Sequence, residues 1–185
     1  RLNIEFTYYS KLSKNQIVTV PVAPSTGYEN RIINAGTFSN KGIELAVRVT
    51  PVSLKNGFKW EVYGTFTKNY SKVIQVADNA EQVILGGYSG MSIVARRGES
   101  YGAFYSVTWQ KDPEGHTIVD SATGMPLVSA KPEIVGNFSP KWLGSLGTSF
   151  SWKGLRFSVL LDARVGGQIY SHTKNIQQFL GEDPL

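Results

Sequence analysis

Alternation of side-chain character over residues 142–165 constrains the fold more than any other feature of this sequence. Apolar residues occupy one parity on both sides of a Lys153-Gly154 turn, and mostly small or charged residues occupy the other. Two alternating segments of about eleven residues joined by a two-residue turn predict a β-hairpin. Segments of about 9–11 residues are also long enough to cross a membrane as tilted strands. The apolar face of this hairpin therefore meets either a protein core or lipid.

Composition and charge exclude several classes of protein. The chain has no cysteine, which excludes disulfides and thiolate metal sites. No apolar run approaches the roughly 18 residues of a membrane-spanning helix. The net charge of +5 comes from scattered lysines and arginines, so no nucleic-acid partner is expected. With 19 glycines, 8 prolines and 12% aromatic residues, the composition favours an all-β protein.

The alternation extends to other parts of the chain and predicts antiparallel strands. We expect strands over residues 1–9, 39–50, 58–70, 142–152 and 155–165, with a possible extra hairpin at 101–121. Short turns at 51–57 and 153–154 alternate with long connections, an asymmetry typical of outer-membrane barrels. If both short turns lie on one side, the segment between residues 70 and 142 contains either no further crossing or two. A sequence that opens inside a strand-like pattern also suggests a piece of something longer.

A soluble β-sandwich, such as a carbohydrate-binding module, also alternates apolar with polar residues. Three features favour a membrane barrel instead: the strands exceed the five or six residues of most soluble sheets, their polar parity carries many charges, and large aromatics lie near strand ends. These aromatics are Tyr8, Tyr9, Trp60, Trp142 and Trp152. Five to seven strands cannot close a barrel, since the smallest outer-membrane barrels use about eight. The membrane interpretation therefore requires a larger barrel.

Several sequence blocks, in order, resemble one known family. The block NAGTFSNKGIELAVRVTP at 34–51 resembles a hallmark of the SusC/RagA family of TonB-dependent outer-membrane transporters of Bacteroidetes. The segments at 95–109 and 134–171 are similar to the family's G-x-x-x-G-x-F-Y segment and to its G-N-x-x-P and G-G-x-x-Y elements. Trp152 stands where the family usually has Tyr before Lys-Gly.

The resemblance implies that residues 1–185 are a C-terminal part of a barrel of about 22 strands in the bacterial outer membrane, with short periplasmic turns and long extracellular loops. It implies a SusD-like lipoprotein as partner, an oligosaccharide or peptide as substrate, and contact with outer-membrane lipid. It also implies that the plug domain, the segment that contacts the TonB complex and the remaining strands lie outside this chain.

No catalytic centre and no cofactor are expected. The two histidines, His116 and His172, lie in loop-like contexts, and no G-x-S-x-G nucleophile motif occurs. A glycan-active enzyme needs a carboxylate pair, for which Glu44 and Glu61 are candidates on neighbouring strands. A weak calcium candidate is the turn that contains Asp112, Glu114 and Asp120, although it lacks the full EF-hand spacing.

Two sets of residues are candidates for contact with a transported molecule. Aromatic side chains in the long connections can stack on sugar rings, and the tyrosines can also form hydrogen bonds. This set consists of Tyr28, Tyr88, Tyr101, Tyr105 and Trp109. Charged residues on the polar parity of the strands are expected to line a water-filled lumen. This second set consists of Glu44, Arg48, Arg156, Asp162 and Arg164.

Overall fold

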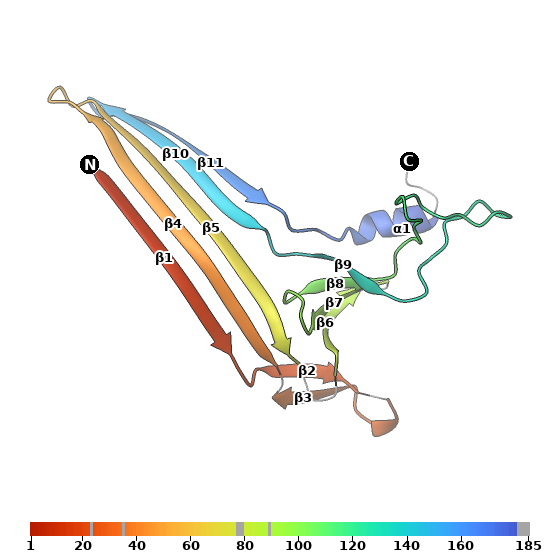
Figure 1. The fold of residues 1–185 in the computed structure, drawn as a ribbon. Helices are drawn as coiled ribbons and strands as arrows, with labels where there is room; N and C mark the ends of the chain where they lie inside the picture. The colour runs from red at the N-terminus through yellow and green to blue at the C-terminus, as the bar shows by residue number, and fades with distance from the viewer. Residues whose placement is uncertain (23, 35, 77–79, 89, 181–185) are drawn as a thin grey trace.

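A five-stranded antiparallel sheet dominates the structure, a computed structural model that describes residues 1–22, 24–34, 36–76, 80–88 and 90–180 (Figure 1). The last five residues of the expected 1–185 domain lie outside the described residues. The strand order is β1-β4-β5-β10-β11, and every neighbouring pair is antiparallel. The strands are β1 (Leu2–Ser13), β4 (Thr37–Ser53), β5 (Lys59–Gln75), β10 (Trp142–Trp152) and β11 (Leu155–Val165). The antiparallel, all-β expectation is therefore confirmed.

Three of these strands extend further than the sequence pattern indicates. β1 continues to Ser13 rather than ending near residue 9, β4 spans 37–53, and β5 continues to Gln75. The extensions mix Ser and Lys with apolar residues in no regular order, which breaks the apolar alternation. Their backbones still pair across the sheet, because ladder hydrogen bonds do not depend on the side chain.

Smaller elements occupy one end of the long sheet. A ribbon pairs β2 (Ile17–Pro21) with β3 (Asn30–Asn34), with a 3-10 helix at Pro24–Thr26 between them. A second sheet has the order β6-β7-β8-β9, formed by Gln82–Tyr88, Met91–Arg96, Ala103–Ser106 and Glu133–Asn137. Helix α1 covers His172–Leu180. No helix among the described residues has the length and apolar character needed to cross a membrane.

The two ends of the long sheet differ in their connections. The turns at 54–58 and 153–154 and the N-terminus lie at one end, which we call the short-turn end (Figure 1). Lys153 and Gly154 both have positive φ, 44° and 87°, as a two-residue type I′ hairpin requires. The smaller sheets and α1 lie at the opposite, long-connection end. β5 pairs directly with β10, so the segment between them adds no strand to the long sheet.

The possible hairpin at 101–121 is formed only near its tip, where backbone hydrogen bonds join Asp112 to His116 and Ile118 to Gln110. β8 pairs with β7 and β9, and this pairing buries Ala103 and Phe104. The residues after β8 form only isolated bridges, among them Lys111 with Thr117. Burial of apolar side chains between two neighbouring strands stabilises β8 more than a local, exposed ladder would.

Strand register divides the long sheet into two faces. Directly paired residues in an antiparallel sheet project on the same side, so the pairings Phe6–Leu45–Phe66 and Gly64–Leu146–Leu161 place these residues on one apolar face. The opposite, polar face carries every carboxylate of the five strands: Glu5, Glu44, Glu61 and Asp162. Leu143 and Leu160 are apolar exceptions on the polar face.

The apolar face is uncovered. Phe6, Leu146 and Leu161 are 66%, 60% and 66% exposed. The main buried cluster lies instead at the long-connection end and contains Phe38, Val73, Val76, Val83 and Ala95. A soluble β-sandwich would pack a second sheet on the apolar face, and nothing in the described part of the chain does so. The structure therefore does not favour the sandwich alternative.

Two polar groups on the apolar face, in Trp60 and Thr148, are paired with each other. The indole Nε1 of Trp60 donates a hydrogen bond to Thr148 Oγ1 over 2.8 Å. The Trp60 ring also stacks on Phe150 at 5.8 Å between centroids, with an interplanar angle of 10°. The hydrogen bond removes the cost of exposing these polar groups to an apolar environment.

Two tyrosines on the polar face lie across glycines of the neighbouring strand. Tyr63 pairs with Gly147 and Tyr9 with Gly42, and a Cβ atom on either glycine would overlap the tyrosine ring. The Tyr9 hydroxyl donates to Asn69 Oδ1 over 3.1 Å. Tyr9 therefore does not belong to an outward aromatic girdle, contrary to the expectation from its place near a strand end. The parity of β1 rather than closeness to the strand end decides its direction.

Candidate functional site

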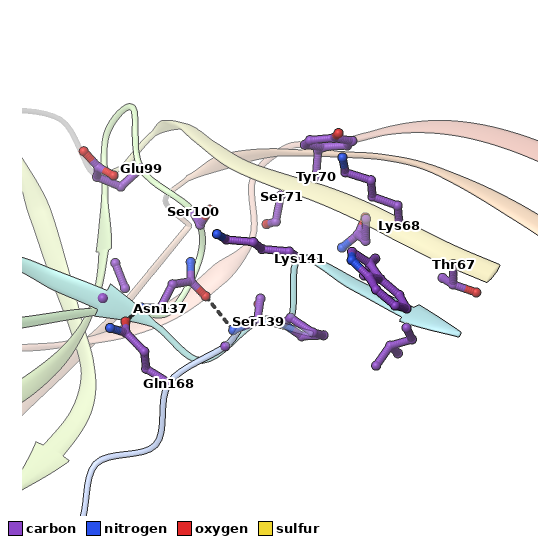
Figure 2. A pocket seen from close by; sticks show the side chains of 18 of the residues that line it. Thr67, Lys68, Tyr70, Ser71, Glu99, Ser100, Asn137, Ser139, Lys141 and Gln168 are labelled. Atoms are coloured by element: carbon purple, nitrogen blue, oxygen red, sulfur yellow. Dashed lines mark hydrogen bonds between the residues drawn. The ribbon is translucent and has the colours of Figure 1, made fainter. Parts of the chain in front are cut away.

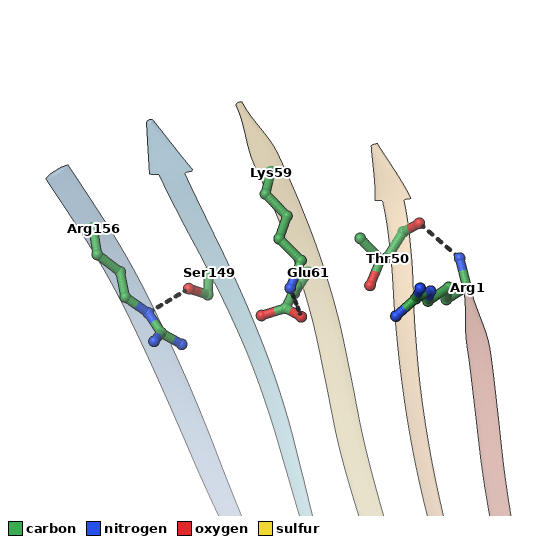
Figure 3. A network of polar contacts seen from close by, with 6 residues as sticks. All are labelled: Arg1, Thr50, Lys59, Glu61, Ser149 and Arg156. Atoms are coloured by element: carbon green, nitrogen blue, oxygen red, sulfur yellow. Dashed lines mark hydrogen bonds and ion pairs between the residues drawn. The ribbon is translucent and has the colours of Figure 1, made fainter. Parts of the chain in front are cut away.

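Polar contacts cross the sheet at the short-turn end of the polar face (Figure 3). The Lys59 ammonium forms an ion pair with Glu61 Oε1 at 2.6 Å. Arg156 Nε donates to Ser149 Oγ over 3.1 Å, and Ser149 is only 3% exposed. Ser149 pairs with Glu61 across β10 and β5, so the two contacts lie side by side. Together they form a charged strip across β5, β10 and β11.

Positive charge exceeds negative charge in this strip. Glu61 interacts electrostatically with Lys59, Arg48 and Arg156. A cavity of about 860 Å³ opens beside it, and Arg1 also lines it. An arrangement of several cations around one carboxylate suits anionic or strongly polar groups.

We expect the Glu61→Gln variant to lose stability mainly at low ionic strength. Removing the carboxylate leaves Lys59, Arg48 and Arg156 without their shared counter-charge, and salt screens the remaining repulsion. The free energy of unfolding measured by urea titration at low and at high salt checks this. A deficit that persists unchanged in high salt would show that Glu61 acts through packing instead.

The five residues expected to line a lumen share one face. Glu44, Arg48, Arg156, Asp162 and Arg164 all have the parity of the polar face. The Arg48 guanidinium lies 5.2 Å from the centre of the Tyr63 ring, and Arg164 Nη2 donates to the Phe138 carbonyl over 2.9 Å. Their role in a lumen stays a prediction.

The possible catalytic pair does not form. Glu44 lies opposite Thr67, six residues after Glu61 on β5. At about 3.4 Å per residue, the two carboxylates are separated by roughly 20 Å along the sheet. Glycoside hydrolysis needs carboxylates no more than about 10 Å apart.

A larger cavity of about 990 Å³ lies at the long-connection end, where β5 and β10 separate (Figure 2). Lys68 and Tyr70 of β5 line one side, with the Lys68 ammonium 4.9 Å from the centre of the Tyr70 ring. Lys141, the residue just before β10, extends its side chain toward Asn137. Its wall thus combines ammonium, amide and hydroxyl groups with aromatic rings.

The aromatic residues expected to bind substrate do not line this cavity. Tyr88, at the end of β6, stacks on His172 with 5.1 Å between ring centroids. The ring centroid of Tyr170 lies 6.1 Å from that of Tyr88. Tyr101 contacts the ring of Phe38 edge-on at 5.2 Å. Tyr88 and Tyr101 therefore belong to two separate aromatic contacts.

The other three aromatic residues of this set lie in separate parts of the chain. Tyr105 lies in β8 with the Arg96 guanidinium 5.8 Å from its ring centre. Trp109 and Tyr28 are 54% and 73% exposed in separate connections. The five residues do not form one site, and substrate contact by any of them stays a prediction.

The weak calcium candidates are occupied by protein contacts or stand apart. Asp112 Oδ1 accepts the backbone N–H of His116 at 2.7 Å. The backbone N–H groups of Thr123 and of the residue before it donate to Asp120, and Thr123 is the first cause of the lowered pKa of this carboxyl. No group of three His, Cys, Asp or Glu side chains gathers within the described ranges, so Glu114 does not join them.

Sequence reasoning missed Lys68, Lys141 and the amide groups of Asn137 and Gln168 in the large cavity. The signal for Lys68 was present: it continues the apolar parity of β5 beyond Phe66. No local pattern brings residues near 137 and 168 to the end of β5, because that contact depends on how the long connections fold.

The family of the chain follows from sequence comparison. The family model described as "TonB dependent receptor-like, beta-barrel" matches residues 1–179. The chain belongs to this TonB-dependent receptor β-barrel family. Members of the family are outer-membrane receptors and transporters rather than enzymes.

Curated relatives agree with this assignment. TonB-dependent receptor P3 of Formosa agariphila is 21% identical over 94% of this chain, and TonB-dependent receptor P26 of the same organism is 25% identical over 92%. The aligned region is 19% of each relative, so the chain spans about a fifth of the length of the curated relatives that it matches.

Solved structures show the same fold. The structure titled "Structure of the RagAB peptide transporter" matches 88% of this chain with a TM-score of 0.66 and 18% identity. The structure of the RagAB peptide importer in the "open-open" state matches 90% with a TM-score of 0.68 and 19% identity. Each match covers 19% of the longer chain. The resemblance to SusC/RagA transporters is therefore confirmed, and the five-stranded sheet is an open part of a TonB-dependent receptor barrel.

Proposed function

We propose that this chain forms part of the wall of an outer-membrane nutrient importer. The observation that carries the proposal is the apolar face of five long strands, exposed on one side of the sheet while the charges lie on the other. Trp142 and Trp152 mark the two ends of this face on β10. Ten residues at about 3.4 Å, tilted by roughly 40°, span about 26 Å, close to the height of the apolar band of such barrels.

The edges of the sheet support a larger barrel. No described strand pairs with the outer edge of β1 or of β11. An unpaired backbone edge in a bilayer costs several kcal/mol for each unsatisfied group, roughly the cost of burying an amide without a partner. Further strands therefore complete the wall, with the short-turn end at the periplasm and the long connections outside the cell.

Transport proceeds without bond chemistry in this proposal. A peptide or oligosaccharide is captured at the outer face together with a SusD-like lipoprotein, and TonB then displaces a plug held inside the barrel. Support comes from the matching fold of the RagAB peptide importer. Residues Glu44, Arg48, Arg156, Asp162 and Arg164 line the lumen, and Tyr28, Tyr88, Tyr101, Tyr105 and Trp109 are available for ligand contact outside it.

Single-cysteine labelling of the full-length receptor tests the wall. Residues 1–185 contain no cysteine, so spin labels can be introduced at adjacent positions such as Leu146 and Ser145, or Leu161 and Asp162. We expect labels at Leu146 and Leu161 to collide preferentially with oxygen dissolved in lipid, and labels at Ser145 and Asp162 with a water-soluble nickel complex.

Equal accessibility at adjacent positions would contradict the membrane wall.

Transport itself requires a separate measurement: deletion of the gene should abolish uptake of labelled peptide or oligosaccharide by cells. Co-purification of a surface lipoprotein with the tagged receptor tests the partner. A receptor that inserts with the expected alternation but supports no uptake would leave the wall intact and overturn the importer.

A further inference from the structure

Three lysines continue the apolar face at the long-connection end. Lys68 pairs with Ile43, Lys41 pairs with Tyr70, and Lys72 follows on β5 with the same parity. Their side chains therefore project on the side of Leu45 and Phe66 rather than toward the polar face. In the proposed wall this is the lipid side, just beyond the aromatic contact of Phe66 with Trp142.

These lysines have no carboxylate partner on their own face. The apolar side of the five strands carries no Asp or Glu among its described residues, and the ion pairs found in that part of the chain do not include Lys41, Lys68 or Lys72. Lys68 lies against the Tyr70 ring, and Lys41 and Lys72 are exposed. An unpaired row of ammonium groups beside an apolar surface attracts a ligand that is both anionic and apolar.

The 990 Å³ cavity adjoins this row. Lys68, Tyr70 and Trp142 line it together with Lys141, so four groups suited to a membrane–water boundary meet at one opening (Figure 2). Trp and Tyr rings favour the headgroup level of a bilayer, and ammonium groups reach upward from it. The ring centroids of Phe66 and Trp142 lie 5.8 Å apart. This pair marks the start of the apolar band, which continues toward the short-turn end.

The opposite end of the apolar face lacks such a row. There Lys153 lies against the Trp152 ring at 5.1 Å, on the turn between β10 and β11. Lys59, the other strand lysine at that end, belongs to the polar face and pairs with Glu61. Among the described strand residues, the lysines of the apolar face therefore lie only at its long-connection end.

We infer that Lys41, Lys68 and Lys72, with Lys141 at the cavity, bind the phosphate groups of lipid headgroups in the leaflet at the long-connection end. Each ammonium donates hydrogen bonds to phosphate oxygens, while the acyl chains lie along the apolar face below Phe66. This inference rests on the proposed membrane wall. Binding fixes lipid at the seam where β5 and β10 separate and shields the cavity from the bilayer.

Lipid selectivity of the full-length receptor tests the inference. The receptor is reconstituted in phosphatidylcholine vesicles that contain either spin-labelled phosphatidic acid or spin-labelled phosphatidylcholine. We expect native receptor to immobilise phosphatidic acid preferentially, and the triple variant Lys41→Gln, Lys68→Gln and Lys72→Gln to lose at least about fivefold of that preference, which is the contribution of about 1 kcal/mol from a single lysine near a charged surface. Replacement by arginine at the same positions should retain it.

Matched controls separate the possible outcomes. Lys11→Gln removes a lysine from the same end but from the polar face, and Lys153→Gln removes one from the short-turn end; both should keep the native preference. An unchanged preference in the triple variant, or an equal loss in Lys11→Gln, would overturn the inference. Displacement of the labelled lipid by millimolar inorganic phosphate would indicate a free-phosphate site instead. Normal insertion without lipid preference would refute this inference alone, whereas failure of the receptor to insert would refute the wall.

Discussion

We expect the Leu146→Arg variant of the full-length receptor to lose about 2–4 kcal/mol of its free energy of unfolding in a bilayer, the cost of arginine at the midplane on the lipid face of a barrel. Leu146 lies midway along β10, is 60% exposed, and pairs with Gly64 and Leu161 on the apolar face. Because no counter-charge lies on this face among the described residues, the guanidinium would face hydrocarbon alone. Urea unfolding in lipid vesicles measures the loss.

The adjacent residue provides the control. Ser145 has the same depth on β10 but projects from the polar face, where it lies between Thr65 and Asp162. Ser145→Arg should cost much less, because the guanidinium reaches water or the Asp162 carboxylate. If both variants lost stability equally, or if Leu146→Arg were harmless, the apolar face would not contact lipid.

We expect Gly147→Val to be the second severe substitution. The Tyr63 ring lies across Gly147, and even a Cβ atom there would overlap it. Valine must therefore displace the ring, break its contact with Arg48 at 5.2 Å and strain the pairing of β5 with β10. Overpacking of this kind costs about 1–3 kcal/mol. Urea unfolding and the fraction of folded receptor on unheated electrophoresis measure the effect.

Removing the tyrosine ring should relieve the defect. Tyr63→Ala alone is expected to cost stability, because Gly147 then lacks its cover, but Tyr63→Ala combined with Gly147→Val should be more stable than the sum of the single changes predicts. Additive losses would show that the glycine is needed for its backbone conformation rather than for the approach of the ring. The pairing of Tyr9 with Gly42 offers the same test on β1 and β4.

At the long-connection end, two apolar residues of the polar face belong to the buried core. Phe38 and Val73 have the parity of this face, and there they form the buried core with Val76, Val83 and Ala95. Backbone hydrogen bonds between Val73 and the segment at 98–99 add to this contact. The connection between β5 and β10 is thus anchored on the polar face of the sheet, which is the lumen side in the proposed wall.

The sequence by itself determined the wall. Alternation around Leu146 and Leu161 placed the apolar residues on one face, and the Lys153-Gly154 pair placed the tight turn, because both depend only on strand parity and local backbone preference. The motif blocks determined the family. Parity also places the lysine row on the apolar face, since Lys68 follows Phe66 by two residues.

Tertiary structure alone decided what the long connections do. Whether β8 pairs with residues near 117 or with β7 and β9 depends on which partner buries Phe104, and local propensity does not encode that choice. The same holds for the cavity, where Lys141 and Gln168 meet the end of β5 across more than sixty residues. Parity sets the direction of Tyr9, but only the register with Gly42 provides the room that its ring occupies. Register and long-range burial, not pattern, set these contacts.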